Sequence, residues 1–189
     1  MGLPSKEAQI QELFFNEPSK HWHFEEIIRT AKISRSQTNH WLKKLLKNKI
    51  ITYNKPRKKF SYFISNVNHS NYKNSKKIFA LNAFQDTGFL EHLASLEKAR
   101  TVIIFGSFSR SDWYADSDID IFIYGNAKDF EIGKFELKLH REIQLFEFED
   151  LAELKKRAPN LIPYIFKGIL VNGELDFIEV NINDKRAHT

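Results

Sequence analysis

Hydrophobic residues recur every three or four positions in three stretches near the start of the chain, which predicts three amphipathic helices. The first runs from Ser5 to about residue 15, the second covers residues 24–31, and the third runs from Ser34 or Ser36 to about residue 48. Two short β-rich runs follow on either side of the basic segment NKPRKK, and they indicate a β-hairpin. The pattern therefore predicts a unit of three helices and a hairpin.

A second pattern occupies the middle of the chain, where two apolar, β-rich runs enclose a polar loop. Residues 102–105 predict a buried strand that ends at Gly106-Ser107, and residues 119–124 predict a second strand. An amphipathic helix over residues 84–100 precedes them, and further short helices and strands follow. This mixture predicts a small domain with helices packed on a mixed sheet.

Two acids, Asp118 and Asp120, stand at the start of the second strand. Because alternate side chains of a strand share a face, the two carboxylates point the same way and repel each other. A divalent cation is the usual reason to keep such a pair, and oxygen ligands suit Mg²⁺ or Mn²⁺. Gly106 lets the backbone approach a ligand and Ser107 adds a hydroxyl, as in a phosphate site. Metal and phosphate together predict a nucleoside triphosphate site.

Two other interpretations of this segment compete with a nucleotide site. Asp116, Asp118 and Asp120 alternate like the start of a calcium-binding loop. However, Ile121 stands where that loop needs glycine and Ala127 where it needs glutamate, which argues against calcium. The remaining alternative is a polar turn before an ordinary strand, with no ligand.

The sequence Gly106-Ser107, followed after ten residues by Asp118-Ile119-Asp120, resembles the signature of the DNA polymerase β-like nucleotidyltransferase superfamily. The motif SDIDI at residues 117–121 is similar to that of the minimal nucleotidyltransferases of prokaryotes, and the resemblance covers about residues 80–175. It implies Mg²⁺- or Mn²⁺-dependent transfer of a nucleotidyl group from a nucleoside triphosphate such as ATP to a hydroxyl acceptor. Some members are antitoxins that modify a toxin, so the acceptor is expected to be a protein, a nucleic acid or a small molecule.

The resemblance also implies roles for single residues. Asp118 and Asp120 are the expected catalytic metal ligands, and Gly106 and Ser107 are expected to bind the phosphates of the nucleotide. Arg110, in the loop between them, is a further candidate contact for the triphosphate, against the alternative of a solvated surface arginine.

The chain departs from the family pattern at one position. Family members carry a third carboxylate on the strand after the intervening helix, where this chain has the neutral Gln144. Glu142 lies two residues earlier on the same strand face and is the expected third catalytic acid in its place. The site is therefore either active with Glu142 or binds a nucleotide without turnover.

The N-terminal pattern of three helices and a hairpin resembles the winged helix-turn-helix of prokaryotic regulators. Residues 32–59 contain ten Lys and Arg and no acid, which favours contact with DNA phosphates. We expect the third helix to enter a major groove and the wing to meet the backbone. The expected DNA-binding residues are Arg35, Ser36, Gln37, Asn39, His40, Lys43, Lys55, Arg57, Lys58 and Lys59. A basic surface that docks a protein is the alternative.

Charge divides the chain into two parts. Residues 1–77 contain 16 Lys and Arg against 5 Asp and Glu, a balance of +11, whereas residues 78–189 contain 13 against 19, a balance of −6. A stretch rich in Asn, Ser and Lys lies between them and predicts a linker. We therefore expect an α+β protein with a winged helix-turn-helix domain at 1–65, a linker at 66–78 and a nucleotidyltransferase-like domain at 79–189.

The absence of cysteine excludes disulfides and thiolate metal sites. No signal-peptide pattern and no apolar stretch of ~20 residues is visible, so the sequence predicts a cytoplasmic protein with no membrane partner.

Two functions are expected. The first is a nucleotidyltransferase that also binds double-stranded DNA, and the second is a DNA-binding regulator whose lapsed domain senses a nucleotide or forms a homodimer. Trp113 and Tyr114 are candidates for stacking on a base, although loop aromatics usually pack on their own domain.

Overall fold

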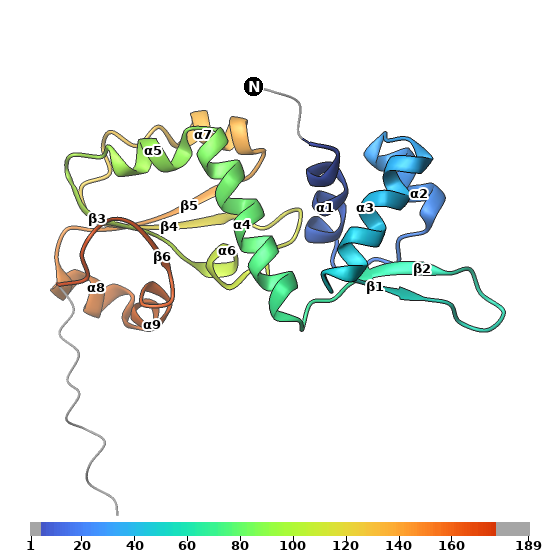
Figure 1. Ribbon diagram of the computed structural model, residues 1–189. Helices are drawn as coiled ribbons and strands as arrows, with labels where there is room; N and C mark the ends of the chain where they lie inside the picture. The colour runs from blue at the N-terminus through green and yellow to red at the C-terminus, as the bar shows by residue number, and fades with distance from the viewer. Residues whose placement is uncertain (1–4, 177–189) are drawn as a thin grey trace, which may run out of the picture.

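The computed structural model describes residues 5–176, and its first five elements are the three helices and the hairpin that the hydrophobic pattern predicts (Figure 1). They are α1 (Lys6–Asn16), α2 (Phe24–Ala31), α3 (Arg35–Lys47), β1 (Ile51–Asn54) and β2 (Tyr62–Ser65). Ser5 caps α1, because its hydroxyl accepts a hydrogen bond from the N–H of Ala8 at 3.1 Å. Ser34 caps α3 in the same way through the N–H of Gln37 at 3.3 Å, so Ser34 is the cap of the third helix.

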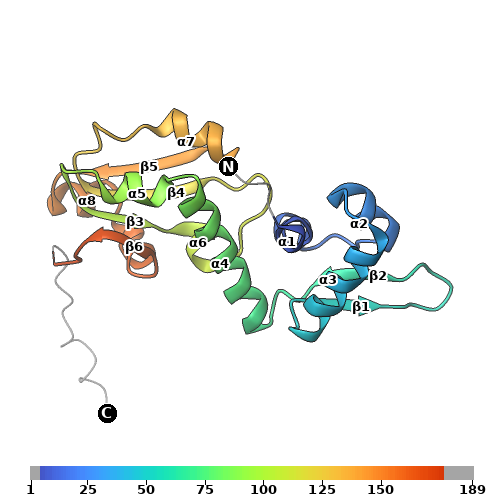
Figure 2. The same ribbon diagram turned by 45° about the horizontal axis from the view of Figure 1, so that its top comes forward.

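The rest of the described chain forms a four-stranded sheet in the order β5–β4–β3–β6, with helices on both faces (Figures 1 and 2). The sheet is mixed, because β3 pairs antiparallel with β4 and β6 whereas β4 and β5 are parallel. Its strands are β3 (Ala99–Ile104), β4 (Ile119–Gly125), β5 (Ile143–Phe148) and β6 (Ile169–Gly173). The helices are α4 (Ser70–Asp86), α5 (Phe89–Ala94), α6 (Gly106–Arg110), α7 (Ile132–Leu139), α8 (Leu151–Arg157), the 3₁₀ helix η1 (Pro159–Leu161) and α9 (Ile162–Ile165). The predicted α+β architecture with a mixed sheet is confirmed.

Alternation along the strands sorts the apolar residues of the sheet into two layers. One layer joins the sheet to α5 and α7 through Ile104, Ile121, Ile123, Phe89 and Phe135. The other joins it to α8 and α9 through Ile103, Phe122, Phe148, Leu154 and Ile165. Helices cover both faces of the sheet (Figure 1), and the exposed Asp118 lies at the end of a central strand, where it precedes β4.

The structure differs from the sequence prediction at residues 70–78. This part of the expected linker forms the first half of α4, which buries Tyr72, Lys76, Ala80 and Phe84. These four residues are spaced four positions apart and so form one stripe along the helix, while the Asn and Ser residues between them lie outside it. The sequence pattern did not reveal this stripe, because one of its buried positions is the lysine Lys76, which counts as polar.

The helix predicted over residues 84–100 is also wrong as a single element. α4 ends at Asp86, α5 runs only from Phe89 to Ala94, and β3 has already begun at Ala99. The break falls at Gly88, whose φ of +76° is a left-handed conformation that glycine adopts without steric cost.

The N-terminal unit packs directly on the sheet domain through a cluster of aromatic rings. Phe15 of α1 meets three rings edge-on, at centroid distances of 5.5, 5.3 and 6.4 Å, and these belong to Tyr72, Phe79 and Trp113. A single cluster of buried residues accordingly extends from α1 through α4 into the sheet. The two units are therefore joined by a shared core as well as by the chain (Figure 1).

Residues 177–189, at the end of the expected nucleotidyltransferase-like domain, lie outside the described residues. None of the helices within residues 5–176 combines the length and the apolar character that a bilayer crossing requires.

Candidate functional site

The two predicted metal-binding acids lie at the start of β4, one of the two central strands of the sheet. Asp120 is the second residue of β4 and is half-buried, whereas Asp118 directly precedes the strand and is exposed. Their side chains interact, because the charge of Asp118 helps to raise the pKa of Asp120. The structure therefore brings the two acids together, as the alternation of side chains along a strand predicts.

Gly106 follows β3 at the same end of the sheet, and its backbone fits closely against Asp120. A Cβ atom on Gly106 would lie 1.8 Å from Oδ2 of Asp120, and the φ of the glycine is +65°. The next residue, Ser107, donates its backbone N–H to the carboxylate of Asp120. From the sequence, we expected the backbone at Gly106 to lie close to a phosphate. In the structure, the group that lies against Gly106 is the carboxylate of Asp120.

The electrostatics of Asp120 favour a bound cation. Burial raises the pKa of its carboxyl above the ordinary value, and the negative charge of Asp118 raises it further. The positive charge of Arg110 and the N–H of Ser107 act in the opposite direction. A divalent cation between the carboxylates would replace their repulsion with two attractions, so the donor set fits Mg²⁺ or Mn²⁺.

Gln144 lies directly beside Asp120 on the neighbouring strand, because the parallel register of β4 and β5 pairs these two residues. Glu142 stands just before β5, where its backbone carbonyl accepts a hydrogen bond from the N–H of Ile119 at 2.9 Å. Both side chains are exposed at the same end of the sheet as the two aspartates. Within residues 5–176, no three acidic, histidine or cysteine side chains form a metal-holding group, so the geometry provides two acids and a neutral amide.

Arg110, the candidate triphosphate contact, is the last residue of α6, and 44% of its side chain is exposed. Its Nε donates a hydrogen bond to Oδ2 of Asp112 at 2.8 Å. The charge of Arg110 nevertheless reaches Asp120, whose pKa it lowers. Among the residues that the structure describes, no hydrogen bond uses the two terminal nitrogens of Arg110, and these nitrogens can donate to a phosphate.

Arg141 holds the loop that leads to the two aspartates, a role that the sequence did not indicate. Its guanidinium donates hydrogen bonds at 2.8–2.9 Å to the backbone carbonyls of Tyr114, Ala115 and Ser117. It also donates to Oδ1 of Asn16, at the end of α1, at 3.0 Å. The backbone carbonyl of Asn16 in turn accepts a hydrogen bond from the N–H of Ala115 at 3.0 Å. The N-terminal unit therefore helps to position the loop just before Asp118.

Lys76 holds the beginning of the same loop and is only 1% exposed. Its ammonium donates to the carbonyl of Phe15 at 2.8 Å, to the hydroxyl of Tyr72 at 3.4 Å and to the carbonyl of Trp113. Burial lowers the pKa of Lys76 to about 8, so the amine is mostly protonated at pH 7 and its three donors match the three acceptors. Nothing in the sequence separates this lysine from its neighbours in a lysine-rich stretch.

We expect Lys76→Met to lower the free energy of unfolding by roughly 2–4 kcal/mol, because two buried carbonyls lose their donor. Urea denaturation at pH 7 measures the change. Lys73→Met is the matched control, since Lys73 is exposed on the same helix, and it should change stability by less than about 0.5 kcal/mol. Equal effects of the two variants would contradict the role assigned to Lys76.

The same lysine predicts a pH dependence. Its pKa is about 8 in the folded protein against 10.5 for the ordinary side chain, so the unfolded chain binds more protons between these values. The contribution of Lys76 to the free energy of unfolding therefore increases as the pH rises from about 8 to 10.5. The difference in free energy of unfolding between the wild type and Lys76→Met should grow from pH 7.5 to pH 9.5, and a shrinking difference would contradict the assignment.

The predicted DNA-binding residues are all exposed, on two elements of the N-terminal unit. Six lie on α3, namely Arg35, Ser36, Gln37, Asn39, His40 and Lys43. Four lie in the loop between β1 and β2, which extends away from the rest of the molecule (Figure 1), namely Lys55, Arg57, Lys58 and Lys59. Arg35 has a partner already: its guanidinium pairs with Glu25 at 2.6 Å and lies 5.3 Å from the ring centre of Phe24.

The mixed sheet, with two aspartates beside Gly106 and Ser107 at the start of α6, fits a small nucleotidyltransferase domain. The family model described as "Polymerase beta, Nucleotidyltransferase" matches residues 90–184, half of the chain, and the chain belongs to this family. The match begins in α5 and includes the whole site from Gly106 to Gln144. Searches among curated proteins and among solved structures returned no match.

Proposed function

We propose that the protein is a Mg²⁺- or Mn²⁺-dependent nucleotidyltransferase that uses a nucleoside triphosphate as donor and a hydroxyl group as acceptor. The hydroxyl oxygen forms a bond to the α-phosphorus, the bond from that phosphorus to the β-phosphate oxygen breaks, and pyrophosphate leaves. The hydroxyl proton passes to solvent. No protein nucleophile takes part, so the side chains act by positioning and by neutralising charge.

The observation that carries this proposal is the pair Asp118 and Asp120 beside Gly106, in a chain of the polymerase beta nucleotidyltransferase family. The two aspartates would hold the cation, which when bound neutralises charge on the triphosphate. Arg110 would donate to a phosphate oxygen through its terminal nitrogens. Release of pyrophosphate from a nucleoside triphosphate, with Mg²⁺ present and then removed by a chelator, tests the reaction.

Two substitutions, one just before β5 and one on it, test which residue serves as the third metal ligand. If Glu142 completes the metal site, Glu142→Gln should lower transfer by at least roughly 100-fold, while Gln144→Asp should change it little. Glu149→Gln, an exposed acid beyond the other end of β5, is the matched control. Transfer rates measured for the three variants decide between the two residues. A large gain in Gln144→Asp with no loss in Glu142→Gln would remove Glu142 from the site.

A DNA-binding regulator with a nucleotide-sensing domain is the second candidate function. The neutral amide of Gln144 beside Asp120 favours it, because an amide is a weaker ligand than a carboxylate for a hard cation. In that case the wild type binds Mg²⁺ with a nucleoside triphosphate but releases no pyrophosphate. Gln144→Asp would then be the variant in which turnover returns.

We further propose that the N-terminal unit is a winged helix-turn-helix that binds double-stranded DNA. The ten cations between residues 32 and 59 support this, as no acid interrupts them and every predicted contact residue is exposed. α3 would enter a major groove, and the loop between β1 and β2 would meet phosphates. The ion pair of Arg35 with Glu25 would open on binding, at little cost, because exposed ion pairs contribute only about 0–1 kcal/mol.

Replacing the four wing cations with alanine should weaken DNA binding and flatten its salt dependence. The four are Lys55, Arg57, Lys58 and Lys59. Each lost phosphate contact lowers the slope of log affinity against log salt by about 0.9, so the slope should fall by up to roughly 3–4. Mobility-shift titrations between 50 and 200 mM salt provide the measurement.

A variant that loses the same number of charges elsewhere controls for net charge. It replaces four exposed cations of the sheet domain with alanine, namely Lys128, Lys155, Lys156 and Arg157. This control should retain most of its affinity for DNA. An unchanged salt slope in the wing variant would exclude the wing from the DNA interface.

A further inference from the structure

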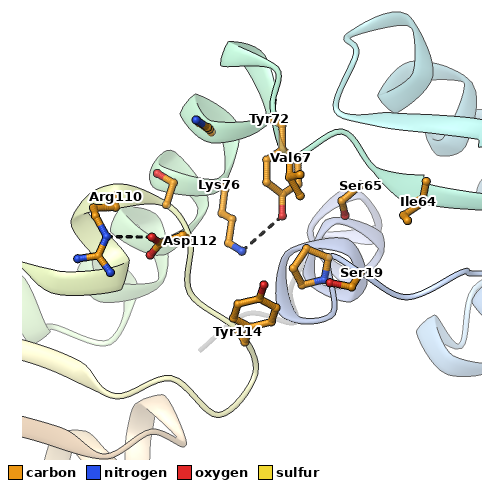
Figure 3. Close-up of a pocket in the computed structure, with 12 residues that line it drawn as sticks. Ser19, Ile64, Ser65, Val67, Tyr72, Lys76, Arg110, Asp112 and Tyr114 are labelled. Carbon is orange, nitrogen blue, oxygen red and sulfur yellow. Dashed lines mark hydrogen bonds and ion pairs between the residues drawn. The ribbon is translucent and has the colours of Figure 1, made fainter.

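A pocket of about 560 Å³ lies between the N-terminal unit, α4 and the loop after α6 (Figure 3), and neither Asp118 nor Asp120 lines it. Pro18 and Val67 come from the N-terminal side, Lys73 from α4, and Arg110 and Tyr114 from the α6 side. Its volume falls in the range of pockets that hold small ligands. The hydrogen bonds of the buried lysine of α4 to both flanking segments hold the walls at a fixed separation.

The charge of this pocket favours an anion. Three cations line it, Lys73, Lys76 and Arg110, against one acid, Asp112. The ammonium of Lys76 donates all its hydrogen bonds to protein acceptors, so it contributes only positive charge to the pocket. Within residues 5–176, the exposed ammonium of Lys73 forms no ion pair, and the terminal nitrogens of Arg110 are likewise unused. Among the lining cations, Lys73 is therefore available to donate to a phosphate, while Arg110, whose terminal nitrogens are assigned to the triphosphate, adds positive charge.

The remaining surface of the pocket suits an aromatic ring. Tyr114 lines the pocket and is 49% exposed as a residue, and Figure 3 shows its ring facing Tyr72 across the space around Lys76. Pro18 and Val67 add apolar surface nearby, and 41% of Val67 is exposed. A base can stack on such a ring whatever its identity, because every base has a π-face.

We infer that this pocket binds a nucleotide unit, one base with its phosphate, and that the unit belongs to the acceptor of the transfer reaction. Arg110 connects the pocket to Asp118 and Asp120, because it lines the pocket at the end of α6, and α6 begins at Gly106, which packs against Asp120. The acceptor role rests on the proposed function, whereas the binding site does not. A free nucleotide and the end of a nucleic-acid strand share this chemistry, and the experiment separates them.

The test is equilibrium binding to the full-length chain in the presence of EDTA, so that Asp118 and Asp120 cannot hold a phosphate through a cation. The probes are adenosine monophosphate and a fluorescent single-stranded pentanucleotide, and the alanine variant of the four wing cations is the starting protein. Lys73→Ala and Tyr114→Ala should each weaken binding roughly tenfold, and Lys73→Arg should retain it. Lys128→Ala, an exposed lysine outside the pocket, should bind like the starting protein.

Weakening of adenosine monophosphate binding in both pocket variants supports the site with a free nucleotide as its ligand. The same weakening for the pentanucleotide alone supports a strand end. Failure of the starting protein to bind either probe overturns the inference, and so does equal affinity in the two pocket variants and Lys128→Ala. If binding holds but no nucleotide or strand accepts a nucleotidyl group, the acceptor role is lost and the binding site stands.

Discussion

Asp118→Asn and Asp120→Asn should each lower the Mg²⁺-dependent affinity for a nucleoside triphosphate by at least roughly 100-fold and abolish measurable transfer. Each substitution keeps the shape of the side chain but removes a negative charge that the cation needs. Calorimetric titration of Mg²⁺ with a triphosphate into the wild type and both variants measures the affinity. Equal affinity in all three proteins would remove these aspartates from the site.

A stability measurement distinguishes a loss of nucleotide affinity from unfolding of the variant. Without metal, Asp120 is held in a partly buried position beside Asp118, and both effects disfavour its charged form. Asp120→Asn relieves both, so the metal-free variant should be no less stable than the wild type in thermal denaturation. A clear loss of stability would mean that the Asp120 carboxylate serves the fold instead of the cation.

Gly106→Ala should also weaken metal-dependent nucleotide binding, because it displaces the carboxylate of Asp120. The new Cβ would lie 1.8 Å from Oδ2 and 2.6 Å from Cγ of Asp120, so the carboxylate would have to leave its place. The φ of +65° adds a steric cost of about 1–2 kcal/mol for any residue with a side chain. We expect Mg²⁺-dependent nucleotide affinity to fall roughly 100-fold, together with a loss of about 1–2 kcal/mol in the free energy of unfolding.

Gly133→Ala is the matched control for this substitution. Gly133 lies in α7, nothing stands within 4 Å of its Cβ position, and alanine is the better helix former by about 1 kcal/mol. It should leave nucleotide binding unchanged and raise stability slightly. Wild-type nucleotide affinity in Gly106→Ala would show that the place of the Asp120 carboxylate against the glycine does not matter for the ligand.

The sequence was sufficient for the parts of the structure that depend on local pattern. Alternation placed Asp118 and Asp120 together, and the register of β4 and β5 puts Gln144, where the sequence pattern led us to expect a third acid, beside Asp120. The three helices, the hairpin and the caps at Ser5 and Ser34 follow from periodicity and from hydroxyl side chains. Each of these features needs only residues that are near each other in the sequence or on paired strands.

The contacts between the two units could not be predicted in this way. Arg141 contacts Asn16, and Lys76 contacts Phe15, across sequence separations of 125 and 61 residues. A lysine within a polar, lysine-rich stretch predicts a solvated helix face, because buried lysine is rare. Only the packing of α1 and the loop after α6 against α4 supplies the carbonyls of Phe15 and Trp113, which join the hydroxyl of Tyr72 to make burial of Lys76 favourable.

The most direct test of the proposed function is transfer of an α-phosphate label. Wild type and Asp120→Asn are incubated with Mg²⁺ or Mn²⁺, a nucleoside triphosphate labelled at the α-phosphate, and three acceptors offered separately: duplex DNA, single-stranded nucleic acid and a protein partner such as a toxin. We predict that the wild type releases pyrophosphate and labels one of the acceptors, and that Asp120→Asn labels none. The absence of label and of pyrophosphate in the wild type, or equal labelling by Asp120→Asn, would contradict a nucleotidyltransferase built on Asp118 and Asp120.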